Sequence, residues 1–374
     1  LEFIQIRENL CLFILVRGGE IVAIFALYVD DFIVGTTSDD IEIWLVSEIS
    51  KNFDIKVIGL PSLLVGISLN WTPTIDGNRF YSKVHLSMSR SINSLLRLCQ
   101  MTTANTKSIP ANPSAVLSKT QCPSIEDRLD GEILNMQKWY RVIVGTFIWI
   151  NTTVRTDISH IVLIICSFMS NPSWEHYNAA LWLLQYLKGS IDRGIEYSVD
   201  ESPDLIGYVD SDHQSHEDRY SVYHYMFLIA GGPLSWKSGF SDRISLSTAE
   251  SEIRGVHAMK QAIKHSIYLK KVFVSLHLSD FARNAVLKLS SLPIVILEDN
   301  RARIRFSLNP ARHSKMKHLE SDIYWILDAV HKFKDIVLEE CSTKDMLADP
   351  GTKNLTTEEF LNKVLRFMVD KIHR

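Results

Sequence analysis

Leu205-Ile-Gly-Tyr-Val-Asp-Ser-Asp-His213 is the stretch around which the rest of the chain is organised. Its alternation of apolar and polar positions predicts a strand that delivers Asp210 to the edge of a sheet. Three later acids are expected to converge on it: Glu250, Asp299 and Asp349. Four carboxylates without a neutralising partner repel one another, so such a cluster is favourable only around divalent metal ions. Sites of that kind carry out phosphodiester chemistry.

The composition is that of an ordinary globular protein. The chain has 374 residues, of which 46% are hydrophobic and 22% charged, with a net charge of -3. The length suits two or three domains, and the charge excludes a protein that coats nucleic acid by bulk charge. No run approaches the ~18 apolar residues of a membrane-spanning helix, and no signal peptide is predicted. Five widely spaced cysteines exclude a zinc site or a disulfide framework and suit a reducing compartment.

An α/β pattern follows the opening stretch. Strands are predicted at 225–229, 234–236 and 243–246, joined by a turn at Gly231-Gly-Pro233. Ser247-Thr-Ala-Glu250 then opens a helix, although Ser-x-x-Glu is also a capping box in which Glu250 serves its own helix end. The apolar run before Asp299 predicts a strand buried on both faces. Asp349 falls in a short predicted helix, where an acid in the first turn also compensates the helix dipole.

The amino-terminal part predicts a hairpin. Cys11 to Val16 and Ile21 to Leu27 are apolar runs joined by Arg17-Gly-Gly-Glu20, and glycine supplies the positive φ of a tight turn. The second strand runs into Tyr28-Val-Asp-Asp31, a pair of acids that simple turn chemistry also explains. Helices are predicted at 41–49, 87–99, 138–150 and 176–189. The rest of 73–130 is punctuated by proline and is predicted to be a linker or a loosely folded loop.

Two regions resemble parts of Ty1/copia-type retrotransposon polyproteins. Leu27-Tyr-Val-Asp-Asp-Phe-Ile-Val-Gly35 resembles the palm hairpin of reverse transcriptases, whose Tyr-x-Asp-Asp carries metal-binding carboxylates, here Tyr28, Asp30 and Asp31. Polymerisation needs a third acid from an earlier palm strand, so this part is not expected to polymerise alone. The helix at 176–189 is similar to the family's "R-x-L-x-Y-L-K-G-T" helix.

The carboxyl-terminal part resembles the ribonuclease H domain of the same family. Gly207-Tyr-Val-Asp-Ser-Asp, Leu246-Ser-Thr-Ala-Glu-Ser-Glu252, Asp299-Asn300 and Ala348-Asp-Pro-Gly-Thr-Lys353 occur in the order of the family's "G-Y-x-D-A-D-W", "S-T-A-E-A-E-Y", "D-N-x-x-A" and "A-D-x-x-T-K". The resemblance implies Asp210, Glu250, Asp299 and Asp349 as catalytic ligands of two Mg²⁺ or Mn²⁺ ions. It implies hydrolysis of the RNA strand of an RNA–DNA hybrid, with selection through the 2′-hydroxyl.

A basic run follows Asp299. It comprises Arg301, Arg303, Arg305, Arg312, Lys315 and Lys317. Such a run is usually a solvated face, but next to the predicted metal site it is a candidate for phosphate contact. His318 matches the family's "K-H-I" motif, and its role is left open.

The expected fold class is α/β (α+β), in three parts. Residues 1–75 are predicted to be a palm remnant, 76–200 a thumb or connection region with an irregular linker, and 201–374 a ribonuclease H-like domain with a mixed five-stranded sheet flanked by helices. His213 replaces a family tryptophan, and His224 replaces a glycine, which is expected to strain the sheet. These departures keep a second reading open, an inactive remnant or nucleic-acid-binding module. The expected partners are the hybrid and the rest of a retrotransposon polyprotein, with no membrane.

Overall fold

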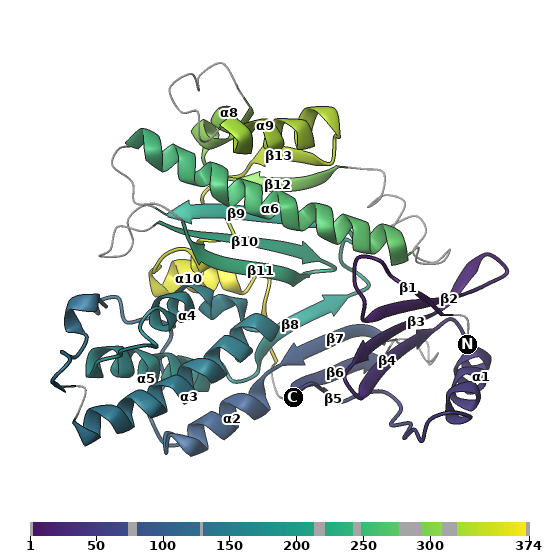
Figure 1. Cartoon of the computed structure of the whole chain (residues 1–374), viewed down its shortest axis with the longest axis horizontal. Helices are drawn as coiled ribbons and strands as arrows, with labels where there is room; N and C mark the ends of the chain where they lie inside the picture. The colour runs from purple at the N-terminus through teal and green to yellow at the C-terminus, as the bar shows by residue number, and fades with distance from the viewer. Residues whose placement is uncertain are drawn as a thin grey trace. The chain divides into compact units, whose positions relative to one another are not determined.

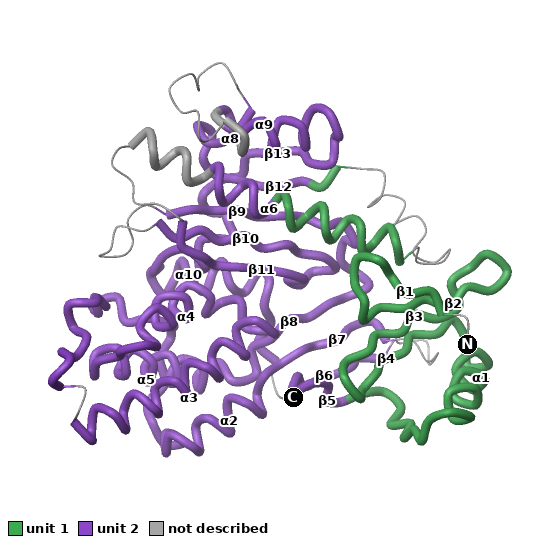
Figure 2. The backbone as a smooth tube through the Cα atoms, in the orientation of Figure 1, with its two compact units in different colours: residues 1–61, 263–294 green, residues 62–262, 295–374 purple. Residues whose placement is uncertain are grey.

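The computed structural model of the protein describes residues 3–73, 81–127, 130–212, 221–241, 248–276, 293–308 and 320–371 (Figure 1). Side chains at 248–255, 306 and 320–322 are outside that description. The chain folds into two compact units, and each is built from separated segments (Figure 2). Unit 1 comprises residues 1–61 and 263–294, and unit 2 comprises residues 62–262 and 295–374. The predicted division at residues 75 and 200 remains a prediction.

Unit 1 is an antiparallel sheet in the order β1-β2-β3-β4, followed by one helix. Its elements are β1 (Phe3–Gln5), β2 (Leu12–Arg17), β3 (Glu20–Tyr28), β4 (Asp31–Thr36) and α1 (Asp39–Ser50). The predicted Gly-Gly hairpin is confirmed, because Gly18 and Gly19 have φ values of 61° and 86°. One core cluster among the described residues consists of three buried isoleucines, with Leu276 from the end of α6 packed against them. Leu45 and Ile49 of α1 are buried as well.

The second hairpin of this sheet carries the acid pair. Tyr28 pairs with Asp31 across the β3–β4 ladder, so Val29 and Asp30 form the two-residue turn. Val29 has a φ of 53°, a conformation that is strained for a β-branched residue. Tyr28 and the two acids are exposed. The hairpin is therefore present as predicted, with both carboxylates at its tip.

Unit 2 contains a second antiparallel sheet, in the order β14-β8-β7-β6-β5. Its strands are β5 (Leu63–Leu64), β6 (Ile67–Pro73), β7 (Tyr81–Ser87), β8 (Arg193–Ser198) and β14 (Val369–Asp370). The expectation of an irregular segment is wrong for residues 81–87, which form the central strand. Val84 pairs with Trp71 of β6, the preceding strand, and with Tyr197 of β8, which comes from far along the chain. Such non-local pairing leaves no trace in a local pattern.

A helical layer supplies most of the core of unit 2. It consists of α2 (Ser89–Leu98), α3 (Gly131–Thr153), α4 (Ser159–Cys166) and α5 (Trp174–Gly189), with short 3-10 turns η1 (Lys119–Gln121) and η3 (Thr156–Ile158). The predicted helices at 87–99, 138–150 and 176–189 are confirmed. Tyr140, Phe147 and Leu184 are fully buried in one continuous cluster.

A network of charged side chains is buried beside this layer. Arg155 and Asp157 have no exposed surface, and their side chains form two hydrogen bonds of 2.8 and 2.7 Å. Tyr186 donates to Asp157 at 2.5 Å, and Arg193 donates to the Tyr186 hydroxyl at 2.9 Å. Arg193 also holds Asp370 through two bonds of 2.7 Å. The network therefore connects β14 to the helices. Removal of one partner is costly, because it leaves a buried charge unpaired.

The third sheet is mixed, five-stranded and ordered β11-β10-β9-β12-β13 (Figure 1). Its strands are β9 (Ile206–Asp212), β10 (Val222–Ile229), β11 (Gly232–Phe240), β12 (Ile294–Glu298) and β13 (Ile336–Glu340). β9, β10 and β11 form the predicted antiparallel meander, whereas β12 runs parallel to β9. The mixed five-stranded sheet is thus confirmed. The strand predicted at 243–246 falls outside the described residues.

Helices flank this sheet. They are α6 (Thr248–Leu276), α8 (Arg301–Leu308), α9 (Glu320–Leu327) with the π-turn η5 (Asp328–Lys332), the 3-10 turn η6 (Asp349–Gly351) and α10 (Thr357–Val364). The ring of His257 on α6 contacts Tyr223 on β10, with centroids 5.6 Å apart. On the β11 side, Ile164 and Phe168 of the helical layer pack with Val222. No helix among the described residues is long and apolar enough to cross a membrane.

Candidate metal-binding site at the end of the mixed sheet

Two parallel strands bring their carboxyl ends to one place. In the β9–β12 ladder Tyr208 is paired with Leu297, and Asp210 and Asp299 each follow two residues later. An open pocket of about 520 Å³ lies at this edge. It is lined by Asp210, Ser211, Asp212, Asp299, Asn300, Arg301, Ala302, Arg303, Glu340 and Lys353. Ligands of α/β sheets bind outside the carboxyl ends of strands, so this is the expected location of a site.

Three carboxylates at this edge are close enough to share an ion. Asp210, Glu298 and Asp299 each offer an oxygen, and these oxygens all lie within 4.8 Å of one another. Glu298 is fully buried, and its Oε2 has no hydrogen-bond partner. Glu298 is not among the residues predicted for the site, because it ends an apolar run and reads as part of the strand. The signal that could have found it is an acid immediately before Asp299 with a basic residue five positions later.

The basic residue is Arg303, whose guanidinium lies among these acids. Its Nη1 is 3.0 Å from Glu298 Oε1 and 3.6 Å from Asp210 Oδ1. Its Nη2 donates to the Ser211 carbonyl oxygen at 2.9 Å. Arg303 is only 6% exposed, so the expectation of a solvent-facing phosphate contact does not fit this residue. It connects the ends of β9 and β12 from inside the protein.

The fourth predicted acid, Asp349, lies at the start of η6. Lys353 Nζ is 2.8 Å from its Oδ1, and Lys363 Nζ is 2.9 Å from its Oδ2. Lys353 also lies 3.7 Å from Asp210 Oδ2, the atom that accepts a 2.7 Å hydrogen bond from Thr352 Oγ1. Asp349 is therefore connected to Asp210 through Lys353 and Thr352, the last two residues of the Ala-Asp-x-x-Thr-Lys motif.

The surroundings shift the ionisation of these carboxyls in different directions. Burial raises the pKa of Asp210, but Lys353 and Arg303 outweigh it, so the pKa lies below its usual value. Burial and the Asp210 carboxylate raise the pKa of Asp349 above its usual value. Burial is also the main reason that the pKa of Glu298 rises to about 8, against the opposing effect of Arg303. Asp210 is therefore the carboxylate most firmly held in its charged form.

The remaining predicted residues are placed less closely or not at all. The backbone of Glu250 lies in the first turn of α6, but its side chain is outside the described residues, as are Arg312, Lys315, Lys317 and His318. Arg301 and Arg305 are exposed on α8, and Arg301 pairs with Glu340. In unit 1, Asp30 and Asp31 belong to no group of three candidate ligands among the residues that the structure describes.

His224 lies directly behind the site. It is in the middle of β10, opposite Asp210, and has no positive φ, so the expectation that a histidine at this position strains the sheet is wrong. Burial lowers its pKa to about 3, which keeps the imidazole neutral. Its Nδ1 is 2.9 Å from Ser238 Oγ, and that hydroxyl donates to the Gly351 carbonyl at 2.7 Å. The imidazole thus packs beneath the turn that carries Asp349.

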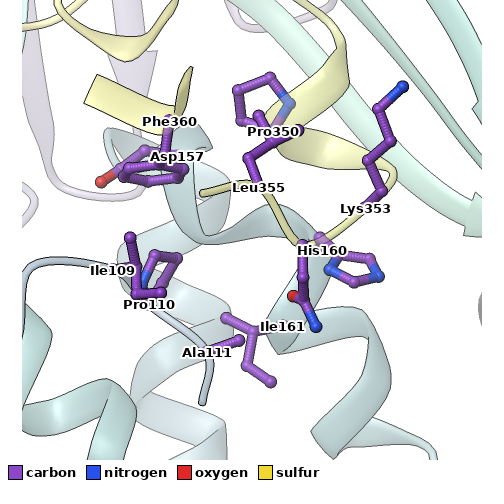
Figure 3. Close-up of a pocket in the computed structure, with 11 residues that line it drawn as sticks. Ile109, Pro110, Ala111, Asp157, His160, Ile161, Pro350, Lys353, Leu355 and Phe360 are labelled. Carbon is purple, nitrogen blue, oxygen red and sulfur yellow. The ribbon is translucent and has the colours of Figure 1, made fainter. Parts of the chain in front are cut away.

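A separate small cavity lies on the other side of that turn (Figure 3). Its wall includes Asp157, His160, Pro350 and Phe360, and its volume is about 10 Å³. That volume is room for about one water molecule, which excludes a substrate site. In Figure 3 the amine of Lys353 points away from the other labelled side chains. This direction agrees with its contacts to Asp210 and Asp349.

The residues present fit one divalent cation. Mg²⁺ and Mn²⁺ prefer carboxylate oxygens, and Asp210, Glu298 and Asp299 each offer one. The Oε2 atom of Glu298 is buried and has no hydrogen-bond partner. Asp349 is held at both oxygens by lysines. Among the described residues only this one group of three acids is close enough to share an ion. A second ion remains a prediction.

Curated proteins similar to this chain are mostly transposon proteins. A retrovirus-related Pol polyprotein from transposon TNT 1-94 of Nicotiana tabacum is 29% identical over 90% of this chain and 24% of its own length. The Pol polyprotein from transposon RE1 of Arabidopsis thaliana is 28% identical over 99% of this chain and 23% of its own length. A putative transposon Ty5-1 protein of Saccharomyces cerevisiae is 26% identical over 57% of this chain.

These matches confirm the resemblance to retrotransposon polyproteins. The chain spans about a quarter of the length of the two Pol polyproteins. No family model matches the sequence. No solved structure matches it either.

Proposed function

We propose that this chain, a relative of transposon Pol polyproteins, contains a metal-dependent nuclease domain that hydrolyses the RNA strand of RNA–DNA hybrids. The observation that carries the proposal is that Asp210 and Asp299 lie at the carboxyl ends of two adjacent parallel strands. Their carboxylate oxygens are close enough to share an ion. The order of the four sequence motifs supports the same assignment. The domain would act within a larger polyprotein, with whose other parts it would associate.

The carboxylates of this chain would hold the ion. Asp210 is the central ligand, because its low pKa keeps it charged and it lies within reach of both Glu298 and Asp299. Glu250 and Asp349 are the further ligands that the sequence resemblance implies. A bound Mg²⁺ would polarise the phosphate and lower the pKa of a water molecule. The chain's own part is to fix these oxygens at the floor of an open pocket that a nucleic-acid backbone can enter.

Two exposed arginines support contact with a phosphate backbone. Arg301 lines the pocket, and Arg305 follows it one turn later on the exposed side of α8. Exposed cations of this kind hold the phosphates electrostatically and make binding sensitive to salt. Discrimination of RNA from DNA requires contact with the 2′-hydroxyl in the wide minor groove of the hybrid.

Cleavage of a labelled RNA–DNA hybrid in the presence of Mg²⁺ tests the proposal. The wild-type protein is expected to shorten the RNA strand, and Asp210→Asn is expected to lower the rate by about 100-fold or more, because the central ligand loses its charge. Asp31→Asn in unit 1 is the matched control and is expected to cleave at the wild-type rate. Equal cleavage by wild type and Asp210→Asn would overturn the proposal.

A second candidate function is a hybrid-binding module without turnover. The observation in its favour is that Arg303, Lys353 and Lys363 already pair with the acids of the site. Calorimetric titration with Mn²⁺ separates the two candidates. Saturable binding that Asp210→Asn abolishes supports the nuclease, whereas hybrid binding without metal binding supports the module.

A further inference from the structure

Arg303 occupies an unusual place for an arginine beside a cation site. It is 6% exposed, and it contacts two of the three carboxylates whose oxygens can share an ion. The family motif "D-N-x-x-A" has alanine as its fifth residue, and Asp299-Asn-Arg-Ala-Arg303 has an arginine there. Alanine cannot reach these acids, so the positive charge at this point is an addition of this chain.

We infer that Arg303 is a resident counter-cation of the acidic cluster, which competes with a divalent metal ion for Asp210 and Glu298. The inference rests on the metal-dependent function proposed above, and it adds a limit on metal affinity that the family motif does not contain. Metal binding then requires that the guanidinium withdraws from both carboxylates, or that the ion binds despite electrostatic repulsion by the guanidinium.

The contacts of Arg303 explain how such a competitor is held. Its Nη2 donates to the Ser211 carbonyl oxygen at 2.9 Å, which anchors one end of the guanidinium to β9. Its Nη1 faces Glu298 at 3.0 Å and Asp210 at 3.6 Å. The fork geometry of arginine permits this division, because separate nitrogens serve the backbone and the carboxylates. A lysine could supply the charge but not both contacts in fixed positions.

Lys353 does not play the same part. It contacts Asp210 and Asp349 rather than Glu298, and it belongs to the Thr-Lys end of a motif that the family shares. Arg303 contacts two of the three acids of the candidate group and departs from the family motif. Its effect on metal affinity is therefore separable from the shared architecture.

Mn²⁺ binding, measured by calorimetry and by the electron paramagnetic resonance signal of free Mn²⁺, tests the inference. Arg303→Gln is expected to tighten Mn²⁺ binding by about tenfold or more, because a fixed positive charge next to the ligands is removed. Arg301→Gln is the matched control. It removes the same charge from the same helix, but Arg301 is 70% exposed and paired with Glu340, so its effect is expected to stay below about threefold.

A second pair of variants covers the case in which Arg303→Gln alone does not fold. Glu298→Gln and the double variant Glu298→Gln/Arg303→Gln differ only at residue 303, and in both variants Asp210 keeps Lys353 and Thr352 as partners. The double variant is expected to bind Mn²⁺ about tenfold more tightly than Glu298→Gln. Two results together overturn the inference. In the first, Arg303→Gln changes Mn²⁺ affinity no more than Arg301→Gln does. In the second, the double variant binds Mn²⁺ no more tightly than Glu298→Gln.

Cleavage of the hybrid is recorded separately for the same proteins. Absence of cleavage in every variant counts against the proposed nuclease, while a tighter Mn²⁺ complex in Arg303→Gln still supports the inference. If the wild type cleaves the hybrid, the nuclease is supported. If Mn²⁺ affinity is at the same time unchanged in Arg303→Gln and in the double variant relative to their parents, the inference is overturned.

Discussion

At the scale of single residues, His224 and Gly351 form a pair that accommodates a large side chain beneath the site. A Cβ added at Gly351 would lie 2.2 Å from His224 Cγ, well inside contact distance. The family motifs have a glycine at the position of His224 and no fixed residue at that of Gly351. The imidazole of His224 thus fills space that the absence of a side chain at Gly351 leaves open.

Gly351→Ala is therefore expected to destabilise the protein by about 1–3 kcal/mol, because the close-packed imidazole has no room to move. The midpoint of urea unfolding measures the loss. The double variant His224→Ala/Gly351→Ala is expected to be more stable than the sum of the single effects, since the clash disappears with the ring. Strictly additive losses would show that the two residues do not interact.

Charge placement at this scale is only partly predictable from sequence. Asp210 and Asp299 were placed correctly at the sheet edge, because the ends of apolar runs indicate the ends of strands. Arg303 was expected to face solvent, because a basic run without acids is usually a solvated face. Its burial depends on Glu298, whose side chain lies inside the sheet edge. A sequence pattern does not show which of two neighbouring acids points inward.

At the scale of elements, the start of α5 depends on a neutral histidine. The backbone N–H of Ser173 donates to His176 Nδ1 at 2.9 Å, and the imidazole stacks on Phe168 with ring centroids 3.8 Å apart. His176 therefore takes the place that Glu or Gln has in a capping box. Burial lowers the pKa of His176 below its usual value. The Ser118 backbone and the charge of Glu175 raise the pKa, but by less than burial lowers it.

This pKa predicts a loss of stability in acid. Below about pH 6.5 the unfolded chain takes up a proton at His176 that the folded protein resists, so the free energy of unfolding falls as the pH falls. One such group contributes a slope of up to about 1.4 kcal/mol per pH unit. His176→Gln keeps the capping bond without titrating, so its unfolding free energy between pH 7.5 and 5.5 should change less than that of the wild type. Parallel pH profiles would contradict the assignment.

The elements themselves were predictable to different degrees. The Gly-Gly hairpin and the helix ending near Gly189 follow from local residues, and the structure has both. β7 did not follow from them, because its hydrogen-bond partners β6 and β8 determine it and β8 lies more than a hundred residues away. Pro73, which predicts a loop before β7, is instead the last residue of β6.

At the scale of the whole molecule, the two units differ in the size of their cores. Among the described residues, unit 1 has a core cluster of three isoleucines and some further buried residues such as Leu45, whereas a single continuous cluster of unit 2 includes Tyr140, Phe147 and many other buried side chains. Hydrophobic burial supplies most of the stability of a domain, and regions with few buried apolar contacts open at lower free energy.

Hydrogen exchange followed by mass spectrometry is therefore expected to show faster exchange in β2 and β3 than in α3 and α5. The difference should reach about tenfold or more in protection, which corresponds to about 1.4 kcal/mol in the free energy of opening. Leu276→Ala, which removes the side chain packed on the three isoleucines, should speed exchange in β2 and leave α3 unchanged. Equal protection of the β2 and α3 peptides would contradict the prediction.

Helix α6 has a consequence for the order in which the chain is made. Unit 1 takes its first segment from residues 1–61 and its second from residues 263–294. The contacts between the described parts of these segments include the packing of Leu276 on the isoleucine cluster and a 2.7 Å hydrogen bond from Ser275 to Glu8. A ribosome adding about 5–20 residues per second needs roughly 10–40 seconds to pass from one segment to the other. During that interval the isoleucine cluster lacks the side chain of Leu276 that later packs on it, and this is the period in which a chaperone would bind the nascent sheet.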